Sequence, residues 1–140
     1  MASDHIHIRI PAHPAHLKQI RTMTAKVAAA AGLAEEEACS VILAVDEACS
    51  NIIKHCCKDD PTRSIDVTVT LDRDCICLTL VDNGKPFDID SIKSRDIREI
   101  KPGGLGVHII RQVMDVVEYS HTPEGLNQVK LVKKLRTWNF

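Results

Sequence analysis

Two alternating segments in the middle of the chain constrain its fold more than any other feature. Residues 64–71 read SIDVTVTL and residues 75–81 read CICLTLV, so apolar side chains recur at every second position in both. This period predicts two β-strands, each with one buried face. The short turn Asp72-Arg73-Asp74 between them predicts an antiparallel hairpin. A hairpin with one apolar face needs a second layer to cover that face, so the rest of the chain must supply it.

The flanking segments supply helices and further strands. Residues 5–10 (HIHIRI) alternate like a strand that Pro11 ends, and an alanine-rich helix follows and ends at Gly32. The expected elements are strands at 5–10, 64–71, 75–81, 115–121 and 128–135, and helices at 15–31, 34–57 and 105–114. This order predicts an α+β fold, a two-layer α/β sandwich with helices on one face of a mixed, mostly antiparallel sheet.

The bulk composition fits one soluble globular domain over residues 1–140. Hydrophobic residues make up 44% of the 140 residues and charged residues 26%, which argues against disorder. The formal net charge of −1 argues against a direct nucleic-acid contact that depends on a strong positive field. No apolar run approaches the roughly 20 residues that span a bilayer, and the N-terminus lacks the layout of a secretion signal. We therefore expect a cytoplasmic protein without a membrane contact.

The six cysteines predict reduced, mostly buried thiols rather than disulfides. Cys56 and Cys57 are adjacent, and Cys75 and Cys77 alternate on an expected strand. A metal site would have to use the adjacent pair with His55, or the histidines near the N-terminus. Neither set has the paired spacing of a structural zinc site, which makes metal the weaker interpretation.

The first polar group that could carry chemistry lies on the long helix. At about 100° per residue, Glu47, Asn51 and Lys54 fall on one side. The opposite face consists of Ala38, Val41, Val45, Cys49, Ile52 and Cys56. A solvated helix face would look similar, but asparagine is a poor choice in the middle of an exposed helix. Leu43 and Ala44 also interrupt the polar side, as if something covered it.

Two further groups follow along the chain. Asp82-Asn83-Gly84 ends a strand, and by itself it is an ordinary tight turn. A carboxylate fixed there beside a glycine also suits recognition of an exocyclic amine such as that of adenine. The glycines of KPGGLG stand immediately before a helix, where free backbone N–H groups can face a phosphate. No Lys-Ser/Thr pair follows them, so this is not a Walker A loop.

The order and spacing of the three groups resemble the N, G1 and G2 boxes of the GHKL (Bergerat-fold) ATPase family, which includes histidine kinases, gyrase B and MutL. The short single-domain form is most similar to the bacterial anti-sigma factor serine/threonine-protein kinases. The matching segments are AVDEACSNIIKH, LVDNGKPFD and GGLGVHIIRQVMDVVEYS. The resemblance covers the chain from about His5 to Leu135, and helix 15–31 matches the family's partner-binding segment in position.

The resemblance implies ATP and Mg²⁺ as cofactors and gives individual residues roles. Asn51 would coordinate the Mg²⁺ that bridges the ATP phosphates, and Glu47 would be the catalytic carboxylate. Asp82 would accept a hydrogen bond from the adenine amine, and residues 88–103 would form the ATP lid. The other implied nucleotide-binding positions are Lys54, Gly84, Phe87, Lys101, Gly103, Gly104, Leu105 and Gly106.

The resemblance also implies a function and raises alternatives. It implies a homodimer that binds a sigma factor and phosphorylates a STAS-type anti-anti-sigma partner on serine. The chain departs from the family pattern before its last strand. It reads Gly125-Leu126-Asn127-Gln128 where the family often carries Gly-Thr, with the threonine near the adenine aspartate. Asn127 or Gln128 would have to act as the polar substitute. If neither does, the chain is a nucleotide-binding module that acts by sequestration without significant kinase activity. A histidine-kinase catalytic domain is disfavoured, because no helical hairpin with a phosphoacceptor histidine precedes the module.

Overall fold

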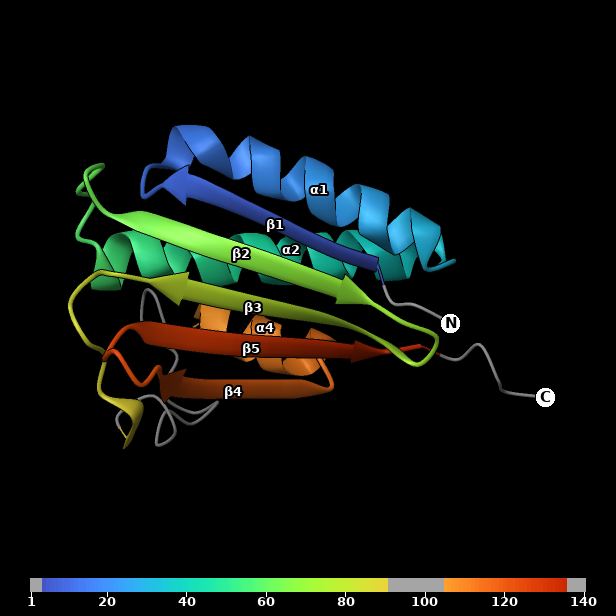
Figure 1. Ribbon diagram of the computed structural model, residues 1–140. Helices are drawn as coiled ribbons and strands as arrows, with labels where there is room; N and C mark the ends of the chain where they lie inside the picture. Colours follow the sequence, from blue (N-terminus) through green and yellow to red (C-terminus); the bar gives the residue numbers. More distant parts are fainter. Residues whose placement is uncertain (1–3, 91–104, 136–140) are drawn as a thin grey trace.

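A single five-stranded sheet forms one layer of the protein (Figure 1). The computed structural model describes residues 4–90 and 105–135. The strand order is β1-β2-β3-β5-β4, and each of these neighbours is paired antiparallel. The strands are β1 (Asp4–Pro11), β2 (Ser64–Leu71), β3 (Cys75–Asp82), β4 (Val116–His121) and β5 (Asn127–Lys134). The sheet expected to be mixed is therefore wholly antiparallel in the described part of the chain.

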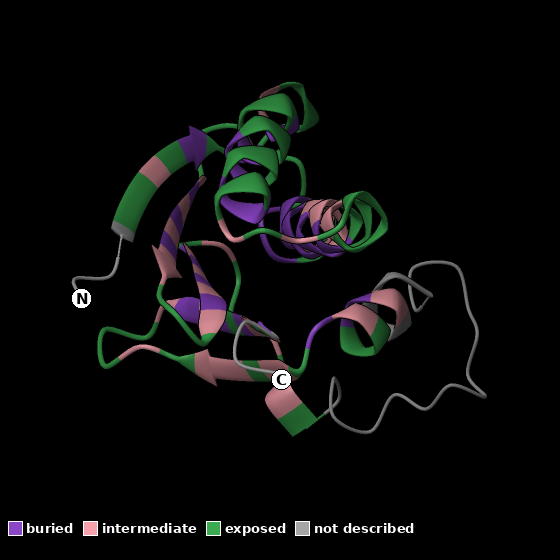
Figure 2. Ribbon diagram, turned by 90° about the vertical axis from the view of Figure 1, so that its right-hand side faces the viewer, coloured by how far each residue is buried: buried purple, intermediate pink, exposed green. Residues whose placement is uncertain are grey.

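The helices form the second layer, on one side of the sheet (Figure 2). Those with bounds inside the described residues are η1 (Pro14–His16), α1 (Leu17–Ala30), α2 (Glu35–Asn51), η2 (Ile52–Cys56) and α4 (Leu105–Val113). Helix α2 contacts both α1 and α4. This arrangement confirms the predicted α+β two-layer sandwich.

The long helix expected over 34–57 consists of two parts. It is α-helical to Asn51, and then η2 forms a π-helical turn in which Cys57 N donates to Ile52 O at 2.9 Å. The chain leaves this turn through Lys58 and Asp59, which have φ of 53° and 59°. A π-turn is wider than an α-turn, so it changes the direction of the residues after Asn51. The expected alignment of Lys54 with Asn51 assumed an unbroken α-helix.

The core lies between the two layers. Alternate strand residues, such as Ile65, Val67 and Leu80, have no exposed surface. The predicted apolar face of α2 is buried at Val41, Val45 and Cys49 and continues through η2. The expectation that something covers the polar side of the helix agrees with Ala44, which is fully buried, and fails at Leu43, which is 47% exposed. Since α2 has a helix on each side as well as the sheet beneath it, more of its circumference is covered than one apolar face.

All six cysteines are free thiols. Cys49, Cys56 and Cys57 are buried, Cys75 and Cys77 are half-buried, and Cys39 is exposed. Within residues 4–90 and 105–135, no group of three His, Cys, Asp or Glu side chains could hold a metal ion. In the same ranges no helix has both the length and the apolar character needed to cross a membrane.

The thiols should differ in reactivity by their burial. Burial raises the pKa of Cys49 and Cys56 to about 12 and that of Cys57 to about 11. Because the thiolate is the reactive form, iodoacetamide at pH 8 should modify exposed Cys39 first and spare these three in the folded protein. Peptide mapping by mass spectrometry after timed labelling measures this, with denatured protein as the control. Equal labelling rates of Cys39 and Cys49 would contradict it.

Candidate functional site

The candidate site lies at the end of the sheet where β3 stops and β5 begins. In the sheet register, Asp82 faces Asn127, and Asn127 in turn faces His121 of β4. Asp82 is 1% exposed and Asn127 has no exposed surface. Three polar residues therefore share one row across neighbouring strands, two of them buried.

The Asp82 carboxylate is only partly satisfied. Its Oδ1 accepts from Gly84 N at 2.9 Å and from Asn127 Nδ2 at 3.0 Å. Its Oδ2 is buried and has no hydrogen-bond partner among the described residues. Burial raises the pKa of this carboxyl above its ordinary value, although the hydrogen bonds from Asn127 and Gly84 work in the opposite direction. A buried acceptor without a donor is unfavourable, so this oxygen is suited to receive an N–H from a ligand.

Gly84 packs against the end of η2. A Cβ at this position would overlap the carbonyl group of Cys56 and lie 2.9 Å from Cys57 N. The next residue, Lys85, donates its N–H to Cys56 O at 2.7 Å. Close packing against Cys56 thus requires a glycine at position 84, in addition to the expected approach of a base. The turn is fixed to the end of η2, which continues directly from α2, the helix that carries Glu47 and Asn51.

Asn127 provides the polar contact that the Gly-Thr departure had put in question. Its Nδ2 donates to Asp82 Oδ1 and, at 2.9 Å, to Lys85 O. Its Oδ1 accepts from Phe87 N at 3.0 Å. Gln128, the other candidate, follows on the opposite face of the strand, with Nε2 3.5 Å from Ser120 Oγ. Of the two residues, Asn127 is the one that contacts the aspartate.

Phe87 belongs to a small aromatic group beside this row. Its ring centroid lies 5.7 Å from that of Tyr119, edge to face, and 5.0 Å from that of His121. The sequence pointed to Phe87 but not to Tyr119 or His121. Tyr119 and His121 are two residues apart on β4, so their side chains lie on the same face of the strand. That spacing was the available signal in the sequence.

Asn83 anchors the turn to the neighbouring strand. Its Oδ1 accepts from Ser64 N at 3.0 Å, and its carbonyl accepts from Arg63 Nη1 at 2.9 Å. The middle residue of Asp82-Asn83-Gly84 therefore has a structural role, and Asp82 is the residue left to face a ligand.

The helix contributes a second buried polar atom without a partner. Asn51 Nδ2 has no hydrogen bond in the described part of the chain. Glu47, one turn earlier, is half-buried, and Lys54 in η2 is exposed. Asp46, next to Glu47, is held by Arg21 of α1, with Nη1 2.8 Å from Oδ1. Helix α2 thus carries two adjacent carboxylates. Asp46 is in an ion pair, and Glu47 has no ion pair with another described residue.

Asn51 is chemically suitable as a magnesium ligand. Mg²⁺ prefers oxygen ligands and usually keeps several water and phosphate oxygens, so one amide oxygen from the protein is sufficient. Nδ2 of this amide makes no hydrogen bond with the described residues that would fix its orientation. The residues present fit the ion.

The phosphate side of the expected site is seen only in part. Lys101, Gly103 and Gly104 lie outside the described residues, as does most of the expected lid. Leu105 begins α4 and Gly106 lies in its first turn, which agrees with the predicted helix start.

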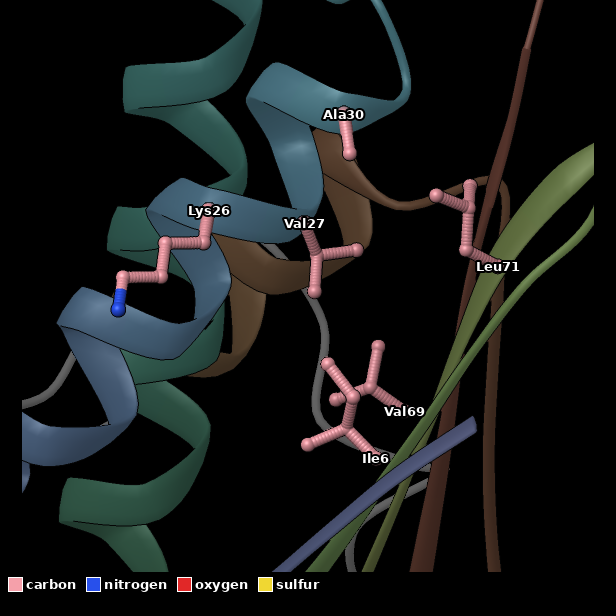
Figure 3. A pocket seen from close by; sticks show the side chains of 6 residues that line it. All are labelled: Ile6, Lys26, Val27, Ala30, Val69 and Leu71. Carbon is pink, nitrogen blue, oxygen red and sulfur yellow. The ribbon is translucent and has the colours of Figure 1, made fainter. Parts of the chain in front are cut away.

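A hollow of about 230 Å³ lies elsewhere, between α1 and the strands β1 and β2 (Figure 3). Its lining is apolar apart from one lysine, and consists of Ile6, Lys26, Val27, Ala30, Val69 and Leu71. An adjoining hollow of about 640 Å³ includes Ile8, Lys18 and Met23. Neither has the carboxylate or the amide of the candidate site, so they do not compete with it as a place for a nucleotide.

Comparison with known proteins agrees with this geometry. The family model described as a histidine kinase-like ATPase domain matches residues 10–133. Serine-protein kinase RsbW of Bacillus cereus (strain B4264) is 31% identical over 129 residues, which cover 86% of this chain and 79% of that protein. Serine-protein kinase RsbW of Bacillus subtilis (strain 168) is 28% identical over 123 residues, covering 82% and 77%. The chain therefore belongs to the histidine kinase-like ATPase family, in the branch of the protein-serine kinases that includes RsbW.

Proposed function

We propose that this chain is an ATP-dependent protein-serine kinase that acts as an anti-sigma factor. In this proposal it binds a sigma factor and phosphorylates a STAS-type anti-anti-sigma partner on serine. The single observation that carries ATP binding is Asp82 Oδ2, a buried acceptor without a partner among the described residues, at the end of the sheet. The membership in the RsbW branch supports the kinase activity and the partner class.

The chemistry of Asp82 favours adenine. An ionised carboxylate only accepts hydrogen bonds, and Oδ1 already has two donors. The remaining oxygen therefore selects a ligand that brings an N–H, as the exocyclic amine of adenine does. Phe87 lies on the same turn, where its ring can contact the base.

The residues of α2 are proposed to serve the phosphates and the attacking hydroxyl. Mg²⁺ held by Asn51 would neutralise charge on the phosphates when bound. Glu47 would orient the substrate serine hydroxyl and accept its proton as the oxygen bonds to the γ-phosphorus and the bond to the leaving ADP breaks. Lys54, Lys101 and the backbone N–H groups of the 103–106 segment would contact phosphate oxygens.

The remaining expectations stay proposals of the same kind. The chain would act as a homodimer in the cytoplasm, without a nucleic-acid or membrane contact. Residues 88–103 would close over the nucleotide as a lid.

The alternative, sequestration without phosphotransfer, was motivated by the loss of Gly-Thr before the last strand. That alternative depended on Asp82 having no polar partner on the last strand. Asn127 is such a partner, because its Nδ2 donates to Asp82 Oδ1 at 3.0 Å. Together with Glu47 in the position of the catalytic carboxylate, this contact favours the kinase.

Replacing Asp82 with asparagine should remove ATP binding and leave the fold intact. Gly84 N and Asn127 Nδ2 both donate to Oδ1, so the new amide would direct its oxygen to them and its NH₂ toward the adenine amine. Two donors would then face each other, and we expect an affinity loss of about 100-fold. Titration calorimetry with Mg-ATP measures this, and circular dichroism checks the fold.

Asp66→Asn is the matched control for this variant. Asp66 lies on the adjacent strand, and its carboxylate is bound by Arg9 and His7. This change should leave ATP affinity unaltered. If Asp82→Asn binds ATP as tightly as the wild type, Asp82 does not read the base.

Mass spectrometry of proteins that co-purify with the tagged chain tests the partners. With Mg-ATP we expect a sigma factor and a STAS-domain protein phosphorylated on serine, and with Asp82→Asn no phosphorylation. Recovery of a sigma factor with no detectable phosphorylation in any condition would favour sequestration alone.

A further inference from the structure

Asn127 is the only described side chain that hydrogen-bonds to the buried Asp82 carboxylate. Its amide uses both ends, since Nδ2 donates to Asp82 Oδ1 and Lys85 O while Oδ1 accepts from Phe87 N. The two backbone contacts with the 85–87 segment fix which end of the amide faces the aspartate. The Asn127 amide is fully buried and makes three hydrogen bonds of 2.9–3.0 Å, which hold it in one orientation. Through the bond from Nδ2 to Oδ1, it also holds the Asp82 carboxylate in one orientation.

The consequence for a ligand is that Oδ1 is already occupied by two donors and only Oδ2 remains. An ionised oxygen in a fixed position accepts a hydrogen bond from the 6-amino group of a purine. A 6-oxo purine would bring a carbonyl lone pair to the same oxygen, and the two acceptors would repel each other.

We propose that Asn127 is a positioning residue that sets the preference of this site for 6-amino over 6-oxo purine nucleotides, by holding Asp82 so that only Oδ2 faces the base. The inference rests on the proposed function, because it requires a nucleotide in this site. From the sequence, Asn127 and Gln128 were equal candidates for a polar partner of the aspartate; the contacts select Asn127 and give it a part in base selection.

The neighbouring groups do not supply this control in place of Asn127. Gly84 N is a backbone donor that belongs to the turn itself. The thiols of Cys56 and Cys57 are close enough to interact with Asp82, and burial keeps both neutral at physiological pH. Arg63, a cation beside the turn, donates to Asn83 O and pairs with Asp60 instead.

Loss of the Asn127 amide would change the protonation of Asp82 as well as its orientation. Burial already raises the pKa of this carboxyl, and the Asn127 hydrogen bond counteracts that rise. Without it the pKa moves further up, so the neutral form is reached at a higher pH. A neutral carboxyl carries an O–H that can donate to a 6-oxo group, and the selectivity then disappears.

The test compares Mg-ATP with Mg-ITP, whose base is a 6-oxo purine, by titration calorimetry from pH 5.5 to 8. We expect the wild type to prefer ATP at pH 8 and Asn127→Ala to reduce the ratio of the two affinities by about tenfold. The ratio should fall with decreasing pH in both proteins, and the fall should begin at a higher pH in Asn127→Ala. Gln128→Ala, one residue along and on the other face of β5, is the control and should keep the wild-type ratio.

Asn127→Asp is a second variant of nearly unchanged size, used if the alanine variant does not fold. Its carboxylate cannot donate to Asp82 unless the two share a proton, so the ratio should fall at pH 8 here too. Circular dichroism and thermal melting establish which variants are folded.

Two outcomes would count against the inference. An unchanged ratio in a folded Asn127 variant overturns it, and if both affinities have fallen equally at every pH, the role of Asn127 is purely structural. A wild type that binds neither nucleotide would overturn the proposed function, and this inference with it.

Discussion

Replacing Glu47 with glutamine is expected to slow phosphoryl transfer to the serine substrate by about 10²–10⁴-fold, the usual contribution of a positioned general base. Glutamine keeps the shape of the side chain but cannot accept the hydroxyl proton. Glu47 is half-buried on α2 and has no ion pair with another described residue, so the change should not disturb the packing. Nucleotide affinity should stay within about threefold of the wild type, because Asp82 and Asn51 are unaltered.

The neighbouring carboxylate provides a matched control. Asp46 is held by Arg21 of α1 at 2.8 Å, so Asp46→Asn removes a carboxylate from the same helix without touching the proposed chemistry. Transfer of the labelled γ-phosphate to the STAS partner under single-turnover conditions measures both variants. Full transfer by Glu47→Gln would remove Glu47 from the catalytic role.

Replacing Gly84 with alanine should destabilise the folded protein by about 3 kcal/mol, the upper part of the range for overpacked sites. The new methyl group would overlap the Cys56 carbonyl, which is backbone and also accepts from Lys85 N. It cannot move without breaking that bond or displacing the end of η2. Urea denaturation followed by circular dichroism gives the free energy of unfolding, and Mg-ATP affinity should fall with it because the turn carries Asp82.

Gly32→Ala separates the overlap from the loss of glycine. Gly32 has φ of +78°, and a methyl group added there would meet no neighbouring atom within 4 Å. Alanine at this position should therefore cost only about 1–2 kcal/mol of backbone strain. If Gly84→Ala is no worse than Gly32→Ala, the close packing against Cys56 is not what requires the glycine.

The fold was largely predictable because its signals are local. Strand β2 was predicted with its observed limits, and β3 to within one residue, since alternation over eight positions leaves little freedom. The π-turn was not predicted. It is only five residues long, and over that length the pattern of apolar residues does not distinguish the period of a π-helix from that of an α-helix. A cover over Ala44 could be suspected from the sequence but not identified, because a pattern on one helix does not reveal which helix packs on its flank.

The site was less predictable because part of it depends on pairing between distant strands. Asp82 could be recognised from its place after a strand and before a glycine. The choice of Asn127 over Gln128 depends on which face of β5 points to the helices, and the register between β3 and β5 decides that. The contact of Gly84 with Cys56 is likewise a tertiary packing detail.

The hydrogen bond between Asn127 and Asp82 joins residues 45 positions apart, and this has a consequence for folding kinetics. Closing such a long loop requires β5 to have inserted beside β3, so the bond forms only once the sheet is essentially complete. A nucleotide that depends on this contact binds the finished chain and not its folding transition state. ATP should therefore prolong the lifetime of the folded protein by slowing unfolding, while the rate of folding stays the same.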